Sequence, residues 1–370
     1  MPTADRRNLR PLLLVGIIVF IITQIVAFSP ASLEEENTGV MVDQEALIPP
    51  SESGEETTLA TGIPKTRIPE YSIDGFFYVS TQDGVKQWKL KASKAYMYNK
   101  EKLVHARQVT AYLYDADDKF TIVTGNEAKY FMNERDLEVY GNVTTKFPDG
   151  FETHSEYMRY RPNDHRIVIP DTYFVEGGGQ EEGGQKIHFT SFGLDFAMAV
   201  SEIVLPKDVK FTLERLQAPT VASEDKPEKK PDITTILSDH CVIYRAKQIA
   251  HFTMYPERPL ETRFVEIHQP TLFARGRRAD VNYGDFSKLL NYMTAYEDVL
   301  IKETGNPTSL RYGTGGRADF DTKKDVIVLR EFPQVYQDED TVTGDIIIVH
   351  RDTDVVEVEH SNAFSQGNNE

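Results

Sequence analysis

Residues 125–143, GNEAKYFMNERDLEVYGNV, contain two alternating segments on either side of a polar turn. Residues 133–136 hold no apolar side chain, and Gly141-Asn142 predicts a break or a bulge. Apolar residues that alternate with polar ones on both sides of a turn predict a strand–turn–strand unit. The apolar residues of this pattern are Ala128, Tyr130, Met132, Leu137, Val139 and Val143.

The same unit recurs along most of the chain. It returns around the turns at residues 99–102 and 162–164 in the first half, and within residues 316–328 and 344–358 in the second. A regular repeat raises the possibility of a parallel β-helix. Each unit here folds back through a polar turn, which favours antiparallel strands stacked along an axis. Residues 289–300 also fit helical spacing, but the surrounding period favours a strand.

The sequence therefore predicts an all-β fold: two β-jellyroll modules of antiparallel strands with an open apolar groove, preceded by one transmembrane helix. Gly-rich residues 177–184 predict a loop, and the Pro-rich and charged residues 216–232 predict a linker. The predicted order is an anchor at 1–30, a tether at 31–69, a module at 70–215, the linker at 216–232, a module at 233–366 and a tail at 367–370.

The amino-terminal region predicts a membrane anchor. Residues 12–28 are almost entirely apolar, three arginines precede them and Glu34, Glu35 and Glu36 follow. Positive-inside logic places the amino terminus in the cytoplasm and the rest across the membrane. The alternative is a cleaved signal peptide, since Ala27-Phe28-Ser29 loosely resembles a cleavage site. The apolar run is long for a signal peptide, so we expect a retained anchor.

Charge and motifs exclude several classes of protein. The formal net charge of -17 disfavours a nucleic-acid partner. The single cysteine, Cys241, permits no intramolecular disulfide. The chain has no H-E-x-x-H, G-x-S-x-G or P-loop motif, and its nine histidines share no metal-ligand spacing. We expect no catalytic residue, no metal site, no cofactor and no enzyme activity.

At residues 88–150 the repeated phrases, including WKLKASKAYMYNKEKL and GNEAKYFMNERDLEVYGNV, resemble the LptC family, the membrane-anchored component of the lipopolysaccharide transport machinery. Residues from about 232 to 366, with GGRADFDTKKDVIVL and TGDIIIVHRDTDVVEV, are similar to the LptA/OstA family, whose members form its periplasmic bridge. The chain resembles a fusion of the two. The match is weakest at residues 177–237, which include the junction.

This resemblance implies transport without catalysis. Lipid A acyl chains would lie in the apolar groove and pass from an inner-membrane ABC transporter toward an outer-membrane translocon. The chain would be a single-pass protein of the inner membrane of a Gram-negative bacterium, with its carboxyl-terminal part in the periplasm. Modules of this family join by edge-strand pairing, so edges are expected near residues 71–80 and 355–364. Within the chain, residues 209–213 and 243–251 are expected to adjoin.

The candidate groove residues are the apolar positions of the alternating segments, which an ordinary sandwich core would also require. They are Trp88, Leu90, Tyr130, Met132, Leu137, Val139, Val281, Phe320, Val326, Val328 and Ile348. Because guanidinium groups bind phosphate well, possible contacts with the lipid phosphates are Arg275, Arg277 and Arg278, which could equally form a solvated loop.

Two other functions remain open. A membrane-anchored β-repeat scaffold of the cell envelope would need the same strands but would hold no lipid. A carbohydrate enzyme would need two carboxylates at a fixed distance. The acidic residues here fall mostly in turns, which makes the enzyme the weaker alternative.

Overall fold

The computed structural model describes residues 68–82, 84–114, 119–180, 185–215, 232–282, 292–304, 311–321, 324–337, 340–351, 353, 355–360 and 362–365. They all belong to the second of two compact units, Thr57–Glu370; the first is Met1–Glu56. The predicted anchor, most of the tether, nearly all of the linker and the tail lie outside the described residues.

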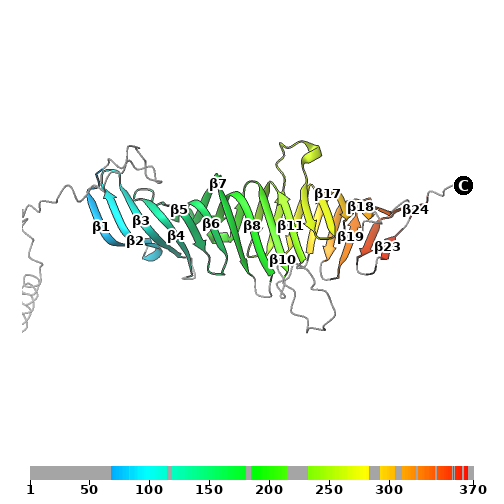
Figure 1. The fold of residues 1–370 in the computed structure, drawn as a ribbon, viewed down its shortest axis with the longest axis horizontal. Coiled ribbons are helices and arrows are strands. Elements are labelled where there is room, and N and C mark those ends of the chain that lie inside the picture. The colour runs from blue at the N-terminus through cyan, green and yellow to red at the C-terminus, as the bar shows by residue number, and fades with distance from the viewer. Residues whose placement is uncertain are drawn as a thin grey trace, which may run out of the picture. The chain divides into compact units, whose positions relative to one another are not determined.

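The described residues form one continuous antiparallel sheet of 24 strands. In Figure 1 the strands run in chain order from β1, in blue, at one end to β23 and β24, in red, at the other. The strands of the first half are mostly long: β1 (Tyr71–Gln82), β2 (Val85–Tyr98), β3 (Leu103–Tyr114), β4 (Phe120–Phe131), β5 (Leu137–Lys146), β6 (Glu152–Arg161), β7 (Arg166–Gln180), β8 (Gln185–Ala197), β9 (Glu202–Leu205) and β10 (Val209–Arg215).

The second half holds mostly short strands, with β17 and β18 as the long ones. They are β11 (Asp232–Ser238), β12 (His240–Tyr244), β13 (Ile249–Thr253), β14 (Val265–Gln269), β15 (Leu272–Gly276), β16 (Arg278–Asn282), β17 (Tyr292–Glu303), β18 (Arg311–Asp321), β19 (Val326–Arg330), β20 (Gln334–Gln337), β21 (Asp340–Thr343), β22 (Ile346–His350), β23 (Val355–Glu359) and β24 (Asn362–Ser365). Short 3-10 turns are η2 (Pro162–Asp164), η3 (Met198–Val200) and η4 (Leu260–Thr262).

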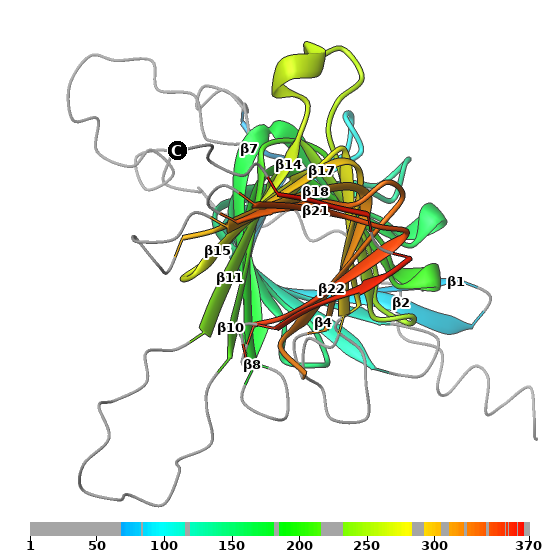
Figure 2. The ribbon, with the colours of Figure 1, turned by 90° about the vertical axis from the view of Figure 1, so that its right-hand side faces the viewer.

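Backbone pairing divides the sheet into two walls. Wall A continues from the first half of β8 through β10, β11, β14, β15, β17, β18, β20, β21 and β24. Wall B continues from the second half of β8 through β9, β12, β13, β16, β17, β18, β19, β22 and β23. In Figure 2, β21 of wall A and β22 of wall B lie on opposite sides.

Most of the long strands belong to both walls because they bend in the middle. The pairings of β4 with β5 and of β5 with β6 both shift register next to Gly141 and Asn142. These two residues have φ angles of 72° and 48°. Left-handed backbone is cheap for glycine and tolerated by asparagine. The bulge predicted at Gly141-Asn142 is therefore confirmed, and its role is to turn one strand from wall B into wall A.

Substituting Gly141 by alanine should lower the free energy of unfolding by about 2 kcal/mol, since the new Cβ adds left-handed strain and crowding. That Cβ would lie 2.8 Å from Nδ2 of Asn126. Gly150 is the matched control, because its φ is also positive but a Cβ there meets nothing within 4 Å. Urea unfolding of Gly150→Ala should show a loss of only about 1 kcal/mol. Equal losses would mean that crowding at the bend contributes nothing.

The two halves of the chain are joined by pairing in both walls. In wall A, β10 pairs with β11, and in wall B, β9 pairs with β12. The prediction that residues 209–213 adjoin 243–251 as paired strands is therefore wrong. Strand β10 instead faces β13 across the walls, where the rings of Phe211 and Phe252 lie 5.5 Å apart.

Two local predictions have different outcomes. Residues 292–300 are a strand, part of β17, as the repeat period predicted. The predicted loop at 177–184 is wrong for Gly177, Gly178 and Gly179, which belong to β7. A Cβ on Gly177 would lie 2.5 Å from Cζ of Phe189, so these glycines serve close strand packing.

Candidate functional site

The inner faces of the two walls form one apolar layer that runs through both halves of the chain. Trp88 and Val281 are 0% exposed, and Tyr130 is 4% exposed. Seven predicted groove residues lie in this layer: Trp88, Leu90, Tyr130, Leu137, Val139, Val281 and Phe320. The walls are in contact, and the residues of this slot between them are buried in one hydrophobic cluster.

Three predicted groove residues lie on the outer face instead. Val328 pairs with Asp319, and the buried Ile327 pairs with Phe320; directly paired residues share a face. Val326, Val328 and Ile348 are only half-buried, whereas Ile327, Leu329, Ile347 and Val349 are buried. These segments are apolar on both faces, so alternation could not choose between them. Met132, half-buried against the core, follows β4 in a turn.

An aromatic cluster joins the walls near β1. Tyr78 and Trp88 lie in wall A, and Tyr130 lies in wall B. The Trp88 and Tyr130 ring centroids are 4.8 Å apart, and those of Tyr78 and Tyr130 are 5.1 Å apart. The hydroxyls of Tyr78 and Tyr130 share a hydrogen bond of 3.1 Å across the slot. Burial, and then this bond, raise the pKa of Tyr130, so its hydroxyl stays protonated.

The slot contains an ion pair near its other end. Arg311 donates from Nε to Glu303 Oε2 at 2.9 Å and from Nη2 to Oε1 at 2.8 Å. The Arg311 side chain is 8% exposed and that of Glu303 is 21% exposed. Both residues line a cavity of about 20 Å³ together with Ile301, Leu329, Val335 and Val349. A cavity of this size holds about one water molecule.

The three arginines proposed as phosphate contacts lie on the outer face and at the bend between β15 and β16. Arg277 donates from Nε and Nη2 to Asp298, at 2.9 and 2.7 Å. Arg278 forms an ion pair with Glu297 at 3.4 Å. The Arg275 guanidinium lies 4.3 Å from the centre of the Phe264 ring. Carboxylates thus already engage two of the three, and phosphate binding here stays a prediction.

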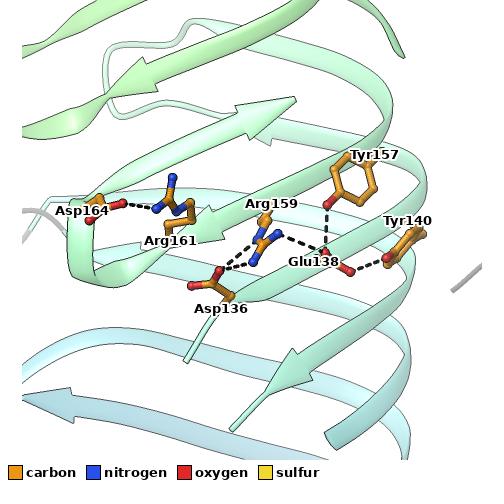
Figure 3. Close-up of polar contacts among 7 residues, drawn as sticks. All are labelled: Asp136, Glu138, Tyr140, Tyr157, Arg159, Arg161 and Asp164. Carbon is orange, nitrogen blue, oxygen red and sulfur yellow. Dashed lines mark hydrogen bonds and ion pairs between the residues drawn. The ribbon is translucent and has the colours of Figure 1, made fainter. Parts of the chain in front are cut away.

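A polar network covers the outer face of β5 and β6 (Figure 3). Arg159 donates to Asp136 at 2.9 and 2.6 Å, while Tyr157 donates to Glu138 at 3.0 Å and Tyr140 donates to the same carboxylate. Burial, followed by the charge of Glu138, raises the pKa of Tyr157, which keeps it a donor. None of these residues was predicted as a site, and in β5 Glu138 and Tyr140 alternate with the inward Leu137 and Val139.

Metal ligands, the cysteine and a membrane-spanning helix were also considered from the sequence, and the described part of the chain places the residues concerned as follows. No three His, Cys, Asp or Glu side chains there are grouped so that they could hold a metal ion. Cys241 is buried, and burial raises the pKa of its thiol well above the usual value. No described helix is long and apolar enough to cross a membrane, and the apolar run at 12–28 lies outside the described residues.

The sheet ends where the sequence predicted. Among the described residues, β1 pairs only with β2, β23 only with β22 and β24 only with β21. Each of these strands therefore has one side whose backbone donors and acceptors can pair with another strand.

Comparisons with known families match both halves of the chain. The family of LptC-related lipopolysaccharide-assembly proteins matches residues 51–214. The family described as the LptA/(LptD N-terminal domain) lipopolysaccharide transport protein matches residues 233–355. The chain is an LptC-related domain fused to an LptA-like domain. The junction between the matched regions coincides with β10–β11 pairing, so the ladder of wall A crosses from the LptC-related domain into the LptA-like domain.

The comparison with solved structures also finds similar chains. No curated protein matches the sequence. A solved structure of LptH, "the LptA homologous periplasmic component of the conserved lipopolysaccharide transport device from Pseudomonas aeruginosa", is similar at 11% identity and a TM-score of 0.32. The match covers 36% of this chain and 95% of LptH.

Sequence reasoning missed two inner-face groups. Tyr78 was not predicted, although it lies two residues after the buried Phe76 and therefore on the same face of β1. Arg311 and Glu303 were not predicted because a charged residue on an inner face contradicts the alternation rule. Both residues lie close to residues 305–310 in the sequence. That segment has no alternating pattern, so it could not show which side chains of the two neighbouring strands point inward.

Proposed function

We propose that the chain is a bridge component of lipopolysaccharide export, which holds lipid A acyl chains between its two walls. The observation that carries the proposal is the apolar inner layer that runs from β1 to β22 between the two walls, with the Arg311–Glu303 pair as a charged point within it. Such a layer suits acyl chains, because each exposed methylene costs about 0.8 kcal/mol. The two matched families, both of lipopolysaccharide assembly and transport, support this reading.

The proposed direction of transport follows from the order of the domains. The predicted anchor at residues 12–28 precedes the LptC-related domain, so β1 would face the inner-membrane ABC transporter. The strands β23 and β24 would then face the outer-membrane translocon. Fusion removes one intermolecular joint, because the ladders of the two domains already pair within one chain.

The alternative is a membrane-anchored scaffold without cargo. Its support is the tight closure of the slot, where Trp88, Leu137 and Val281 are 0% exposed. The two functions differ in bound lipid. Chain extracted gently from the cell envelope should carry lipopolysaccharide if it is a conduit and none if it is a scaffold.

Photo-crosslinking tests the path itself. A crosslinking amino acid in place of Tyr130 or Ile327 should capture lipopolysaccharide in cells, because both side chains point between the walls. The matched controls are the neighbours Lys129 and Val328, which lie on the outer face and should label at least about tenfold less, given the alternation of side chains. Asp319 also lies on the outer face but does not make a suitable control, because it is 2% exposed and forms an ion pair with Arg317 at 2.8 Å. Equal labelling of inner and outer positions would contradict the slot.

A further inference from the structure

The aromatic cluster of Tyr78, Trp88 and Tyr130 differs from the contact between Phe211 and Phe252 across the slot. Phe211 and Phe252 bring only hydrocarbon to the middle of the slot. The aromatic cluster instead places an indole N–H and two hydroxyls in the part of the slot near β1. In that part of the layer Trp88 is 0% and Tyr130 is 4% exposed. Buried tryptophan and tyrosine side chains normally direct their polar atoms to a partner.

The donors of the cluster exceed its acceptors. No side chain or backbone atom in the described part of the chain accepts a hydrogen bond from Trp88 Nε1. The two hydroxyls bond to each other, and in such a pair only one O–H can donate to the other oxygen. The Trp88 N–H therefore points into a closed apolar layer without an acceptor, and the tyrosine pair has one further O–H that its partner does not accept. A buried donor left in this way destabilises the closed state.

A guest in the slot changes this balance. An acyl chain that separates the walls at β1 must part Tyr130 from Trp88 and break the bond between Tyr78 and Tyr130. A purely alkyl guest would then leave all three donors facing hydrocarbon. A chain that carries a carbonyl oxygen at this level would give them an acceptor.

We propose that the aromatic cluster is a gate that selects ester-linked acyl chains, with Trp88 Nε1 donating to the acyl carbonyl. The gate is closed when the slot is empty, through the Tyr78–Tyr130 hydrogen bond, and the carbonyl of the guest replaces that bond. Because the cluster lies in β1, β2 and β4, a guest that enters from the β1 end meets it first. This inference rests on the proposed function, since it requires that the slot take acyl chains.

A matched pair of probes tests the gate on the full chain held in an amphipol. Sucrose monododecanoate carries a twelve-carbon chain through an ester, and dodecyl maltoside, the ether probe, carries one through a glycosidic C–O–C oxygen without a carbonyl. Trp88 is the single tryptophan, so its emission reports whether a probe reaches the cluster. By titration calorimetry the ester should bind about tenfold more tightly than the ether, the effect of one well-placed hydrogen bond.

Variants assign the preference to the cluster. Benzothienylalanine at position 88 keeps the bicyclic ring but lacks the N–H, and should bring the ester-to-ether ratio to about one. The double variant Tyr78→Phe with Tyr130→Phe removes the bond that closes the gate, and should tighten binding of the ether. Phe211→Leu changes the apolar contact in the middle and should leave the ratio unchanged.

Three outcomes would overturn the gate. Equal affinities of the unaltered chain for the two probes would exclude it while leaving the crosslinking test of the slot intact. A preference that survives loss of the Trp88 N–H would place selection elsewhere. If neither probe binds and Trp88 emission is unchanged, the slot takes no acyl chain, and the gate and the proposed function both fail.

Discussion

Replacing Glu303 by glutamine should lower the free energy of unfolding by about 3–5 kcal/mol, the usual cost of breaking a buried ion pair. Glutamine keeps the shape of the side chain, but the Arg311 guanidinium, 8% exposed, would lose its bidentate carboxylate at 2.8 and 2.9 Å. The cavity that the pair lines, about 20 Å³, has room for about one water molecule, and one water does not replace a bidentate carboxylate. Urea unfolding followed by far-ultraviolet circular dichroism measures the change.

The control is an ion pair of the same geometry outside the slot. Arg166 donates to Asp195 at 2.9 and 2.6 Å, but these side chains are 39% and 32% exposed. Asp195→Asn should therefore cost less than about 1 kcal/mol, as solvated pairs do. The double variant Glu303→Leu with Arg311→Met should be close to the unaltered chain in stability, since apolar replacements of buried pairs are often neutral. A similar cost for Glu303→Gln and Asp195→Asn would contradict the burial argument.

Proline in β23 should abolish pairing with the next bridge component while leaving the domain folded, at one of two adjacent positions. Successive N–H groups of a strand point to opposite sides, so of Val356 and Glu357 one points toward β22 and the other toward the open edge. Proline removes the donor and fixes φ. The variant at the outward position should lose at least about tenfold in partner affinity, because strand addition depends on main-chain hydrogen bonds.

A pull-down of the periplasmic domain of the outer-membrane translocon measures binding, and circular dichroism measures folding. The variant at the inward position is the internal control, since it should weaken the β22–β23 pairing and lower stability. The two positions must be adjacent, because residues two apart in a strand, such as Val356 and Val358, direct their N–H groups to the same side. Undiminished binding by both proline variants, with both folded, would show that the bridge does not continue through this edge.

The inner layer of the two walls consists mainly of apolar side chains and contains two polar features at different places along its length. The aromatic cluster lies near β1, and the Arg311–Glu303 pair lies in β17 and β18. They differ in pairing, since Arg311 and Glu303 share two hydrogen bonds whereas the Trp88 N–H has no acceptor. Only the second leaves a buried polar group that costs stability in the closed slot.

The sequence alone determined the strands, the turns and the family. Alternation at Ala128 and Tyr130, and the turn before Leu137, predicted β4 and β5 correctly, and Gly141-Asn142 located the bend. These features are local, since each depends on side chains within a few residues. The repeated phrases were enough to identify both domains, because they preserve the same local pattern along the chain.

Only the tertiary structure decided which residues face the slot and which meet across it. In the run Val326 to Leu329 every side chain is apolar, so only pairing with Phe320 and Asp319 chose the inner face for Ile327 and Leu329. Tyr78 and Tyr130 meet because separate ladders bring them opposite each other, which no local pattern encodes. Alternation specifies that a strand has two faces, whereas the register between distant strands specifies which face is buried.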